Sequence, residues 1–174
     1  MTLSSEELKN THDVKLVKTC IQLKATLENM LSILFLHYEC QYALLSFSDA
    51  QFSHIPCSVC RADDAFGMPF TEKAAHFRGK SFCQLTLHRP IPVIISPICA
   101  SENFGDHPLV VGEPGLTSFV GVPLVIGVKF AGALCMFWTS GKCNRSIWDY
   151  TKAADVARNI SAMLECEVAA ASHA

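Results

Sequence analysis

The sequence feature that most constrains the fold is a pair of strand-like segments, 118–126 and 129–139, separated only by Gly127 and Val128. Both segments are rich in β-branched and aromatic residues, which favour strands. A two-residue connection is typical of a β-hairpin, whose strands are antiparallel. Pro123 indicates a bulge or an edge-facing amide within the first segment. The chain is therefore expected to be built on an antiparallel sheet.

Helices are expected at both ends of this strand-rich middle. The first runs from a capping box at Ser4 and Glu7 to about Tyr38, with a break or restart near 10–13. Its apolar seam follows alternating steps of four and three, a pattern that predicts contact with a partner helix: Leu16, Cys20, Leu23, Leu27, Met30 and Leu34. The second helix begins near Ser146 and ends near Glu167, with one apolar face: Ala153, Ala157, Ile160 and Leu164.

Shorter elements are expected between these landmarks. Segment 42–48 reads as a strand, and 52–59 as a weaker strand for which Pro56 indicates an edge position. A short helix over 81–88 and a short buried strand over 92–96 follow, and 101–115 is irregular with turns of helix. This order predicts an α+β fold, a single antiparallel sheet with helices mainly on one face.

Composition narrows the class of protein. The chain has 174 residues, half of them hydrophobic and 17% charged, which suits one domain with a sizeable core. The net charge of -2, without a basic block, argues against non-specific nucleic-acid binding. The longest apolar run, 30–36, is too short to span a bilayer, and the polar start is unlike a signal peptide. A cytoplasmic protein is expected, with no membrane or nucleic-acid partner.

The nine cysteines do not suggest a disulfide framework, because their number is odd and no secretory signal precedes them. Several lie in apolar stretches, such as Cys135 within 133–137, where a cysteine is most simply a small core residue.

Five short motifs occur in a defined order between the helical ends: Ser81-Phe82-Cys83, Ile91-Pro92-Val93-Ile94-Ile95, Asn103-Phe104 with His107-Pro108-Leu109-Val110, Phe119-Val120-Gly121-Val122-Pro123-Leu124, and Gly132-Ala133-Leu134-Cys135-Met136. Their order and spacing resemble GAF domains of the bacterial-signalling type over about 31–165. One departure concerns the position after the second motif, where GAF domains often have an aspartate. Ser96 and Pro97 stand there, and the next acid is Glu102, so a role for that carboxylate loses its support.

The resemblance implies a sheet of five to six antiparallel strands, with the terminal helices on one face and a ligand-covering cross-over, 79–116, on the other. It divides the chain into an N-terminal helical extension over 1–30, a GAF domain over 31–168 and a disordered tail over 169–174. Glycines inside strands, Gly121 and Gly132, independently predict that another group approaches closely there.

The same resemblance implies a small-molecule sensor that signals to a partner through its helices, although it does not identify the ligand or a cofactor. The start of the helix at Ser81, Phe82 and Cys83 is a candidate contact for an anion or a carbonyl. The resemblance also implies that six apolar residues line the wall of the ligand pocket: Phe82, Leu85, Ile95, Phe104, Leu109 and Phe119. The alternative interpretation is that they are ordinary core residues and that no cavity exists.

His54, Cys57 and Cys60 are a weaker candidate for a metal site. Cys40, His76 or Cys83 would have to supply the fourth zinc ligand, and no second Cys-x-x-Cys is present. On a strand, Cys57 and Cys60 are expected to point to opposite faces, which argues against a shared ion.

Cysteine catalysis is the competing class of function, because one GAF-like group reduces free methionine sulfoxide with thiols. Cys83 would be the low-pKa thiolate and Cys99 its resolving partner. The motif of that group is absent from this sequence. No motif for bilin, haem or cyclic-nucleotide binding was found either; Cys83, for example, is followed by Gln84 rather than His.

The apolar seam of the first helix predicts a homodimer or docking to a sensor kinase, as GAF domains often dimerise through their terminal helices. The alternative is that the seam packs only on the chain's own sheet and terminal helix. A third class of function is a degenerate GAF domain that makes only protein contacts.

Overall fold

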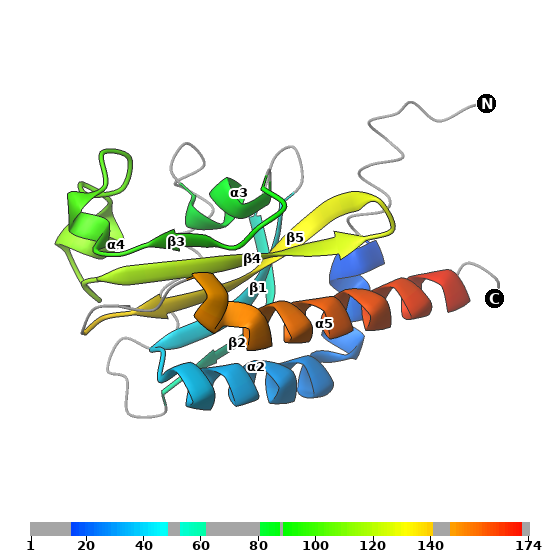
Figure 1. The fold of residues 1–174 in the computed structure, drawn as a ribbon. Helices are drawn as coiled ribbons and strands as arrows, with labels where there is room; N and C mark the ends of the chain where they lie inside the picture. The colour runs from blue at the N-terminus through cyan, green and yellow to red at the C-terminus, as the bar shows by residue number, and fades with distance from the viewer. Residues whose placement is uncertain (1–14, 49–52, 62–80, 88, 141–146, 172–174) are drawn as a thin grey trace.

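The computed structural model describes residues 15–48, 53–61, 81–87, 89–140 and 147–171. Within these ranges five strands form one antiparallel sheet in the order β2-β1-β5-β4-β3 (Figure 1). The strands are β1 (Tyr42–Ser48), β2 (Ser53–Cys60), β3 (Val93–Ile95), β4 (Ser118–Ile126) and β5 (Lys129–Trp138). The α+β fold expected from the sequence is confirmed.

The β4–β5 hairpin closes through Gly127 and Val128 and forms the centre of the sheet with β1. Gly127 has a φ of 62°, the left-handed conformation that a tight hairpin turn requires and that glycine adopts readily. The hairpin predicted from the sequence is therefore confirmed. Pro123 pairs with Ala133 of β5, while β3 begins opposite Gly121, so Pro123 lies beyond the start of β3, where no strand needs its missing N–H.

The two outer strands differ in how well the sequence predicted them. Strand β2 carries Pro56 at an edge of the sheet, as expected. Strand β3 was expected to be buried, and this was wrong: it has three residues at the opposite edge, and only Val93 is buried. An apolar run of this length looks alike in sequence whether the strand lies at the centre or the edge of a sheet.

Two long helices cover one face of the sheet. Helix α2 (Lys24–Tyr38), preceded by helical residues 15–22, packs on β1 and β2, and α5 (Thr151–Ala170) packs on β4 (Figure 1). Helix α5 follows the 3-10 turn η4 (Ile147–Tyr150) and extends beyond the end expected at Glu167. Its predicted face is buried as expected: Ala153, Ala157, Ile160 and Leu164. Ser146, the expected start, lies outside the described residues.

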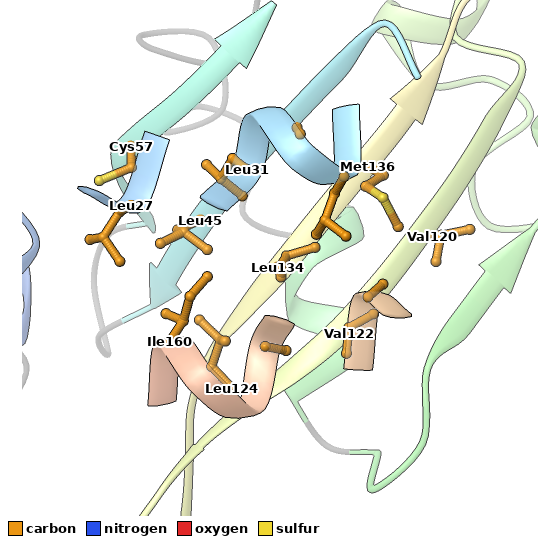
Figure 2. Close-up of a cluster of buried hydrophobic side chains, with 14 of the residues drawn as sticks. Leu27, Leu31, Leu45, Cys57, Val120, Val122, Leu124, Leu134, Met136 and Ile160 are labelled. Carbon is orange, nitrogen blue, oxygen red and sulfur yellow. The ribbon is translucent and has the colours of Figure 1, made fainter. Parts of the chain in front are cut away.

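Most of the N-terminal apolar seam is buried against the chain's own sheet and α5. Leu16, Cys20, Leu27 and Leu34 have no exposed surface. They belong to the buried core between the sheet and the two helices, which we call the helix-side cluster and which also includes Leu45, Val120, Leu124, Leu134 and Ile160 (Figure 2). The seam's burial therefore needs no second chain, so the seam does not support the predicted homodimer or partner docking, which stays a prediction. The large apolar residues of this region that remain exposed are Ile21, Ile33 and Leu36.

Tyr38 connects these two helices at one end. Its hydroxyl donates to the carbonyl of Asp149 at 3.0 Å and accepts from the backbone N–H of Ala153 at 3.3 Å, while its carbonyl accepts from the Trp138 indole at 3.2 Å. The end of α2, the start of α5 and the end of β5 are thus held together by one buried residue.

The opposite face is covered by a second layer of short elements, which we call the cover. It consists of α3 (Phe82–Leu87), the 3-10 turn η3 (Ile98–Ala100) and α4 (Pro108–Val111) (Figure 1). The short helix and the helical turn predicted at these positions are confirmed. No helix among the described residues is long and apolar enough to cross a membrane.

Candidate functional site

A second core lies between the sheet and the cover, and we call it the cover-side cluster. Strands β4 and β5 alternate strictly at their centres: Val120 and Leu134 face the helices, whereas Phe119 and Cys135 face the cover. Its buried members come from the sheet, from the cover and from the loops that join them: Tyr42, Leu44, Phe82, Cys83, Val93, Ile98, Phe104, Leu109, Leu116, Phe119, Ala133, Cys135 and Phe137.

Phe82 is the central ring of this cluster. It stacks on Phe104 with the centroids 4.4 Å apart, and its centroid lies 5.3 Å from that of Phe119 and 5.6 Å from that of Phe137. Phe119 and Phe137 in turn are 5.0 Å apart. These distances are typical of favourable aromatic pairs. The aromatic residues expected to line a ligand site therefore meet, and in this structure they pack on one another.

His107 is the buried polar residue beside these rings. It is 4% exposed, and its ring centroid lies 4.9 Å from that of Phe82. It caps α4, because its Nδ1 accepts from the backbone N–H of Leu109 at 3.2 Å, and Pro108 occupies the first helical position. An accepting Nδ1 places the ring proton on Nε2, so the imidazole brings a hydrogen-bond donor into a mainly apolar layer.

Helix α3 sits very close to β4 at Gly121. A Cβ built there would lie 2.0 Å from Thr86 Oγ1, so any side chain at this position would displace the helix. The close approach predicted for Gly121 is confirmed, as it is for Gly132, where a Cβ would lie 2.6 Å from the Ser46 carbonyl oxygen. Thr86 is fully buried, and its hydroxyl has no hydrogen-bond partner among the described residues.

The close approach brings two thiols into contact. Gly121 pairs with Cys135 across β4 and β5, and Cys83 reaches down from α3 onto this pair. The Cys135 thiol donates to Cys83 Sγ, and the two sulfurs are 3.1 Å apart. Cys83 is 8% exposed and Cys135 has no exposed surface.

The two thiols differ in acidity. The hydrogen bond from Cys135 lowers the pKa of Cys83 and outweighs burial, which raises it; a hydrogen bond from Ser46 lowers it further. Burial raises the pKa of Cys135, and the hydrogen bond to Cys83 with its negative charge raises it further. The pair therefore gives up one proton more readily than the second, and the charge lies on Cys83.

The structure brings most of the predicted site residues together. Phe82, Cys83, Phe104, Leu109 and Phe119 are buried in the cover-side cluster, and Leu85 and Ile95 are half-buried against it. Ser81 is half-buried just before α3. That helix has only six residues, so the dipole available to an anion at its start is small.

The predicted metal ligands are not brought together. Cys57 is buried in the helix-side cluster, whereas Cys60 packs against the cover-side cluster, so the sheet separates the two thiols as expected. Among the described residues, no group of three His, Cys, Asp or Glu is placed to hold a metal ion. His76 and the start of the cross-over lie outside the described residues.

The sequence-based pairing of Cys83 with Cys99 was wrong. Cys99 is exposed on η3, and the thiol in contact with Cys83 is that of Cys135. Cys135 was interpreted as a plain core residue because its neighbours are apolar, and its contact comes from a residue 52 positions away. His107 belonged to the third sequence motif but was not predicted as a site residue, although the proline that follows it is a usable signal of a helix start.

Comparison with known proteins follows from this geometry. The family model described as GAF domain matches residues 22–167. No curated protein matches the chain.

Three solved structures share the fold. The chain is similar to the blue-light absorbing form of the PixJ GAF domain of Thermosynechococcus elongatus, with a TM-score of 0.67 and 14% identity, over 87% of this chain and 92% of that one. It is similar to a GAF domain/HD domain protein from Geobacter sulfurreducens, with a TM-score of 0.63 and 12% identity, over 87% and 97%. A type II free methionine-R-sulfoxide reductase from Thermoplasma acidophilum has a TM-score of 0.61 and 11% identity, over 86% and 94%.

Proposed function

The chain belongs to the GAF domain family, and from this premise we propose that it is a sensor module that binds a small molecule between its sheet and its cover. The structure adds His107 and Thr86 to the proposed ligand contacts. The contacts predicted from the sequence are Ser81, Phe82, Cys83, Leu85, Ile95, Phe104, Leu109 and Phe119. The cytoplasmic location stays a prediction.

The observation that supports this proposal most is the composition of the layer under the cover. Small-molecule sites in proteins are mainly apolar and aromatic, with a few polar groups that orient the ligand. The cover-side cluster combines stacked rings with the His107 imidazole and the buried, unsatisfied Thr86 hydroxyl. A buried hydroxyl without a partner is rare, and a ligand or an ordered water would satisfy it.

Ligand entry would require the cover to move, because Phe82 occupies the middle of the layer. The cover is built of short elements: α3 has six residues, η3 three and α4 four. Elements of this size are among the least stable parts of a domain and can open locally without global unfolding. We therefore expect ligand binding to exchange ring-to-ring contacts for ring-to-ligand contacts.

Strand β4 is the proposed route from the ligand to the helices. It presents Phe119 to the cover and Val120 and Val122 to the helix side, where α5 packs on it. Tyr38 then links α5 to α2. A ligand shifts this arrangement only if it binds two conformations with different affinity.

The proposed output partner is a second copy of the chain or a sensor kinase. The surface that supports this is the outward side of residues 15–38, where Ile21, Ile33 and Leu36 are 58%, 52% and 74% exposed. Ile33 and Leu36 lie one turn apart on α2, and exposed apolar patches often mark protein interfaces. The Geobacter neighbour combines a GAF domain with an HD domain, which fits a role as a regulatory module.

The test of ligand binding is native mass spectrometry of the freshly purified full chain, followed by a filled variant. Leu109→Trp adds volume inside the cover-side cluster and is expected to abolish the bound mass while circular dichroism stays that of the wild type. Ile91→Trp is the matched control, because Ile91 lies in the same cross-over but is 56% exposed. This variant should keep the ligand. If the wild type carries no added mass and a panel of metabolites does not shift its melting temperature, the cover-side cluster is ordinary core and the chain is a protein-contact module.

A thiol reductase is the second candidate function, favoured by the contact between Cys83 and Cys135 and by the fold shared with a methionine-sulfoxide reductase. Cys83→Ser distinguishes the two. For a sensor, the wild type shows no reduction of free methionine sulfoxide with a dithiol, and Cys83→Ser changes nothing in that assay. For a reductase, the wild type turns over and Cys83→Ser does not.

A further inference from the structure

We propose that Cys83 and Cys135 form an oxidisable dithiol, whose disulfide would bind α3 of the cover covalently to the central strand β5. The observation behind this is the contact between the two sulfurs at 3.1 Å in a site where both side chains are buried. The proposal goes beyond ligand sensing and does not depend on it, because it concerns only the chain's own residues.

The geometry favours a bond with little rearrangement. A disulfide has its sulfurs about 2.05 Å apart, so the pair must close by about 1 Å. Both side chains already point at one another, one from α3 and one from the cover face of β5. Gly121 permits this approach because it faces Cys135 across the hairpin and has no side chain beneath α3.

The surroundings of Cys83 also favour reaction there rather than at other buried thiols. Its pKa is lowered by the hydrogen bonds from Cys135 and Ser46, and the thiolate is the nucleophilic form of cysteine. By contrast, burial raises the pKa of Cys57 to about 11 and that of Cys20 to about 12 on the other face of the sheet. Cys57 donates to the carbonyl of Cys20 at 3.7 Å, so it has no thiolate-stabilising partner in that contact.

The proposed oxidant is a hydroperoxide, ROOH, and the chemistry balances in two steps. The Cys83 thiolate attacks the terminal oxygen, so that an S–O bond forms, the O–O bond breaks and RO⁻ leaves to take up a proton as ROH. The Cys135 sulfur then attacks Cys83 sulfenic acid, so that the S–S bond forms and the S–O bond breaks; hydroxide leaves and takes the Cys135 proton as water. Two thiols and one ROOH thus yield one disulfide, ROH and H₂O.

The consequence of oxidation would be a cover that cannot lift away from the sheet at α3. The bond would close a loop between positions 52 apart in the chain, which restricts the unfolded ensemble strongly. We expect the oxidised protein to melt about 5 °C or more above the reduced protein. Opening of α3, measured as hydrogen exchange of its amides, should slow on oxidation and recover when dithiothreitol is added.

The test uses the full chain carrying Cys99→Ser and Cys166→Ser, because these two cysteines are exposed and would form intermolecular bonds. The reduced protein is treated with a small excess of hydrogen peroxide, its free thiols are alkylated under denaturing conditions, and peptides are mapped by mass spectrometry. The expected product is a Cys83–Cys135 cross-linked peptide, 2 Da lighter than its two thiol peptides, which disappears with dithiothreitol.

Variants separate this assignment from general oxidation. Cys135→Ser should leave Cys83 as a sulfenic acid that dimedone captures, and Cys135→Ala serves the same purpose if the serine variant does not fold. The matched control Cys57→Ser should leave the cross-link yield unchanged. The proposal is overturned if Cys83 stays a free thiol while Cys57 is oxidised, or if Cys83 proceeds to the sulfinic acid in the presence of Cys135.

The outcome is independent of the sensor proposal. The cross-link is measured without any added small molecule, so a disulfide in a protein that carries no ligand would overturn ligand sensing alone. Conversely, a ligand-bearing protein in which the cross-link never forms would overturn only the dithiol.

Discussion

The two faces of the sheet are both buried, but they are packed with different chemistry. On the helix side, aliphatic side chains from the sheet meet two long helices (Figure 2). On the cover side, aromatic rings and buried polar side chains, among them Ser46, Thr86 and His107, meet elements of three to six residues. The first arrangement suits a stable scaffold, and the second suits a layer that opens and closes.

Each face also contains a pair of neighbouring cysteines, and the comparison shows how environment decides reactivity. Cys20 and Cys57 are buried on the helix side, where burial raises the pKa of both thiols. Cys83 is also buried, on the cover side, yet a thiol and a hydroxyl donate to it and lower its pKa. Burial alone therefore makes a cysteine inert, whereas burial next to a hydrogen-bond donor makes it a candidate nucleophile.

The largest expected effect is a loss of stability on the helix side of the sheet. Leu134 is fully buried at the centre of β5 on the helix side, and Leu134→Ala should lower the free energy of unfolding by about 3–5 kcal/mol, because a cavity adds to the lost transfer energy. Urea denaturation measures this change in the free energy of unfolding. Leu36→Ala, at a side chain that is 74% exposed, is the control and should cost less than about 0.5 kcal/mol. Equal losses at the two positions would contradict the burial assigned to this face.

The next effect is on the contact between α3 and the sheet. Gly121→Ala places a Cβ where Thr86 Oγ1 and the Phe119 ring now lie, so we expect a loss of about 2 kcal/mol in stability. The shift of α3 should also reduce the Cys83–Cys135 cross-link severalfold. Adding Thr86→Ala to this variant removes the closest clash and should restore part of both losses. A Gly121→Ala protein with wild-type stability and cross-linking would show that α3 does not rest on β4.

A third test compares the two thiol pairs as the pH rises. The pKa of Cys57 is raised from 9.0 to about 11, so alkylation of Cys57 should stay slow through pH 9 and accelerate only near pH 11. The lowered pKa of Cys83 predicts a thiolate at lower pH, and an alkylation rate at pH 8 at least about tenfold above that of Cys57. Iodoacetamide labelling of the native protein, quantified by peptide mapping, gives both profiles. Superimposable profiles would remove the distinction between the two faces.

The same shifts predict how stability depends on pH on the helix side. The folded pKa values of Cys20 and Cys57, about 12 and about 11, lie above the ordinary 9.0, so the folded protein retains protons that the unfolded chain releases. This contribution is complete below pH 9 and is lost as the pH rises towards 11–12. Urea midpoints measured from pH 8 to 11 should fall less steeply in a Cys20→Ser/Cys57→Ser variant.

The smallest expected effect is at the cap of α4. His107→Ala removes the acceptor for the Leu109 N–H and should cost about 1 kcal/mol, with faster hydrogen exchange confined to the cover. His107→Asn supplies another acceptor and should restore the cap. If exchange also rises in α2 and α5, the cover does not open independently of the scaffold.

Local signals in the sequence were enough for most of the individual elements. The alternation of residues 118–138 around Gly127 specified the hairpin and which side chains share a face. Pro56 located an edge strand, and the periodicity around Ala157 and Ile160 specified the buried side of α5. These properties depend on the residue types within one or two turns or one hairpin, which is why they can be predicted without knowing the rest of the molecule.

The candidate site was only partly predictable. Resemblance to a family indicated Phe82, Phe104 and Phe119, and these rings do meet. It did not indicate His107 or Thr86, because a cap and an unsatisfied hydroxyl are defined by neighbours rather than by residue type.

By itself, the sequence determined the antiparallel hairpin, the two helical ends and the faces they bury, because periodicity and turn chemistry are local. Only the tertiary structure decided what covers those faces: periodicity shows that Leu27 is buried, but not that the chain's own sheet buries it. It also decided that Cys83 meets Cys135 rather than Cys99, since that contact depends on the pairing of Gly121 with Cys135 and on how closely α3 sits above it. Contacts between residues 52 positions apart are set by packing and register, which no short stretch of sequence encodes.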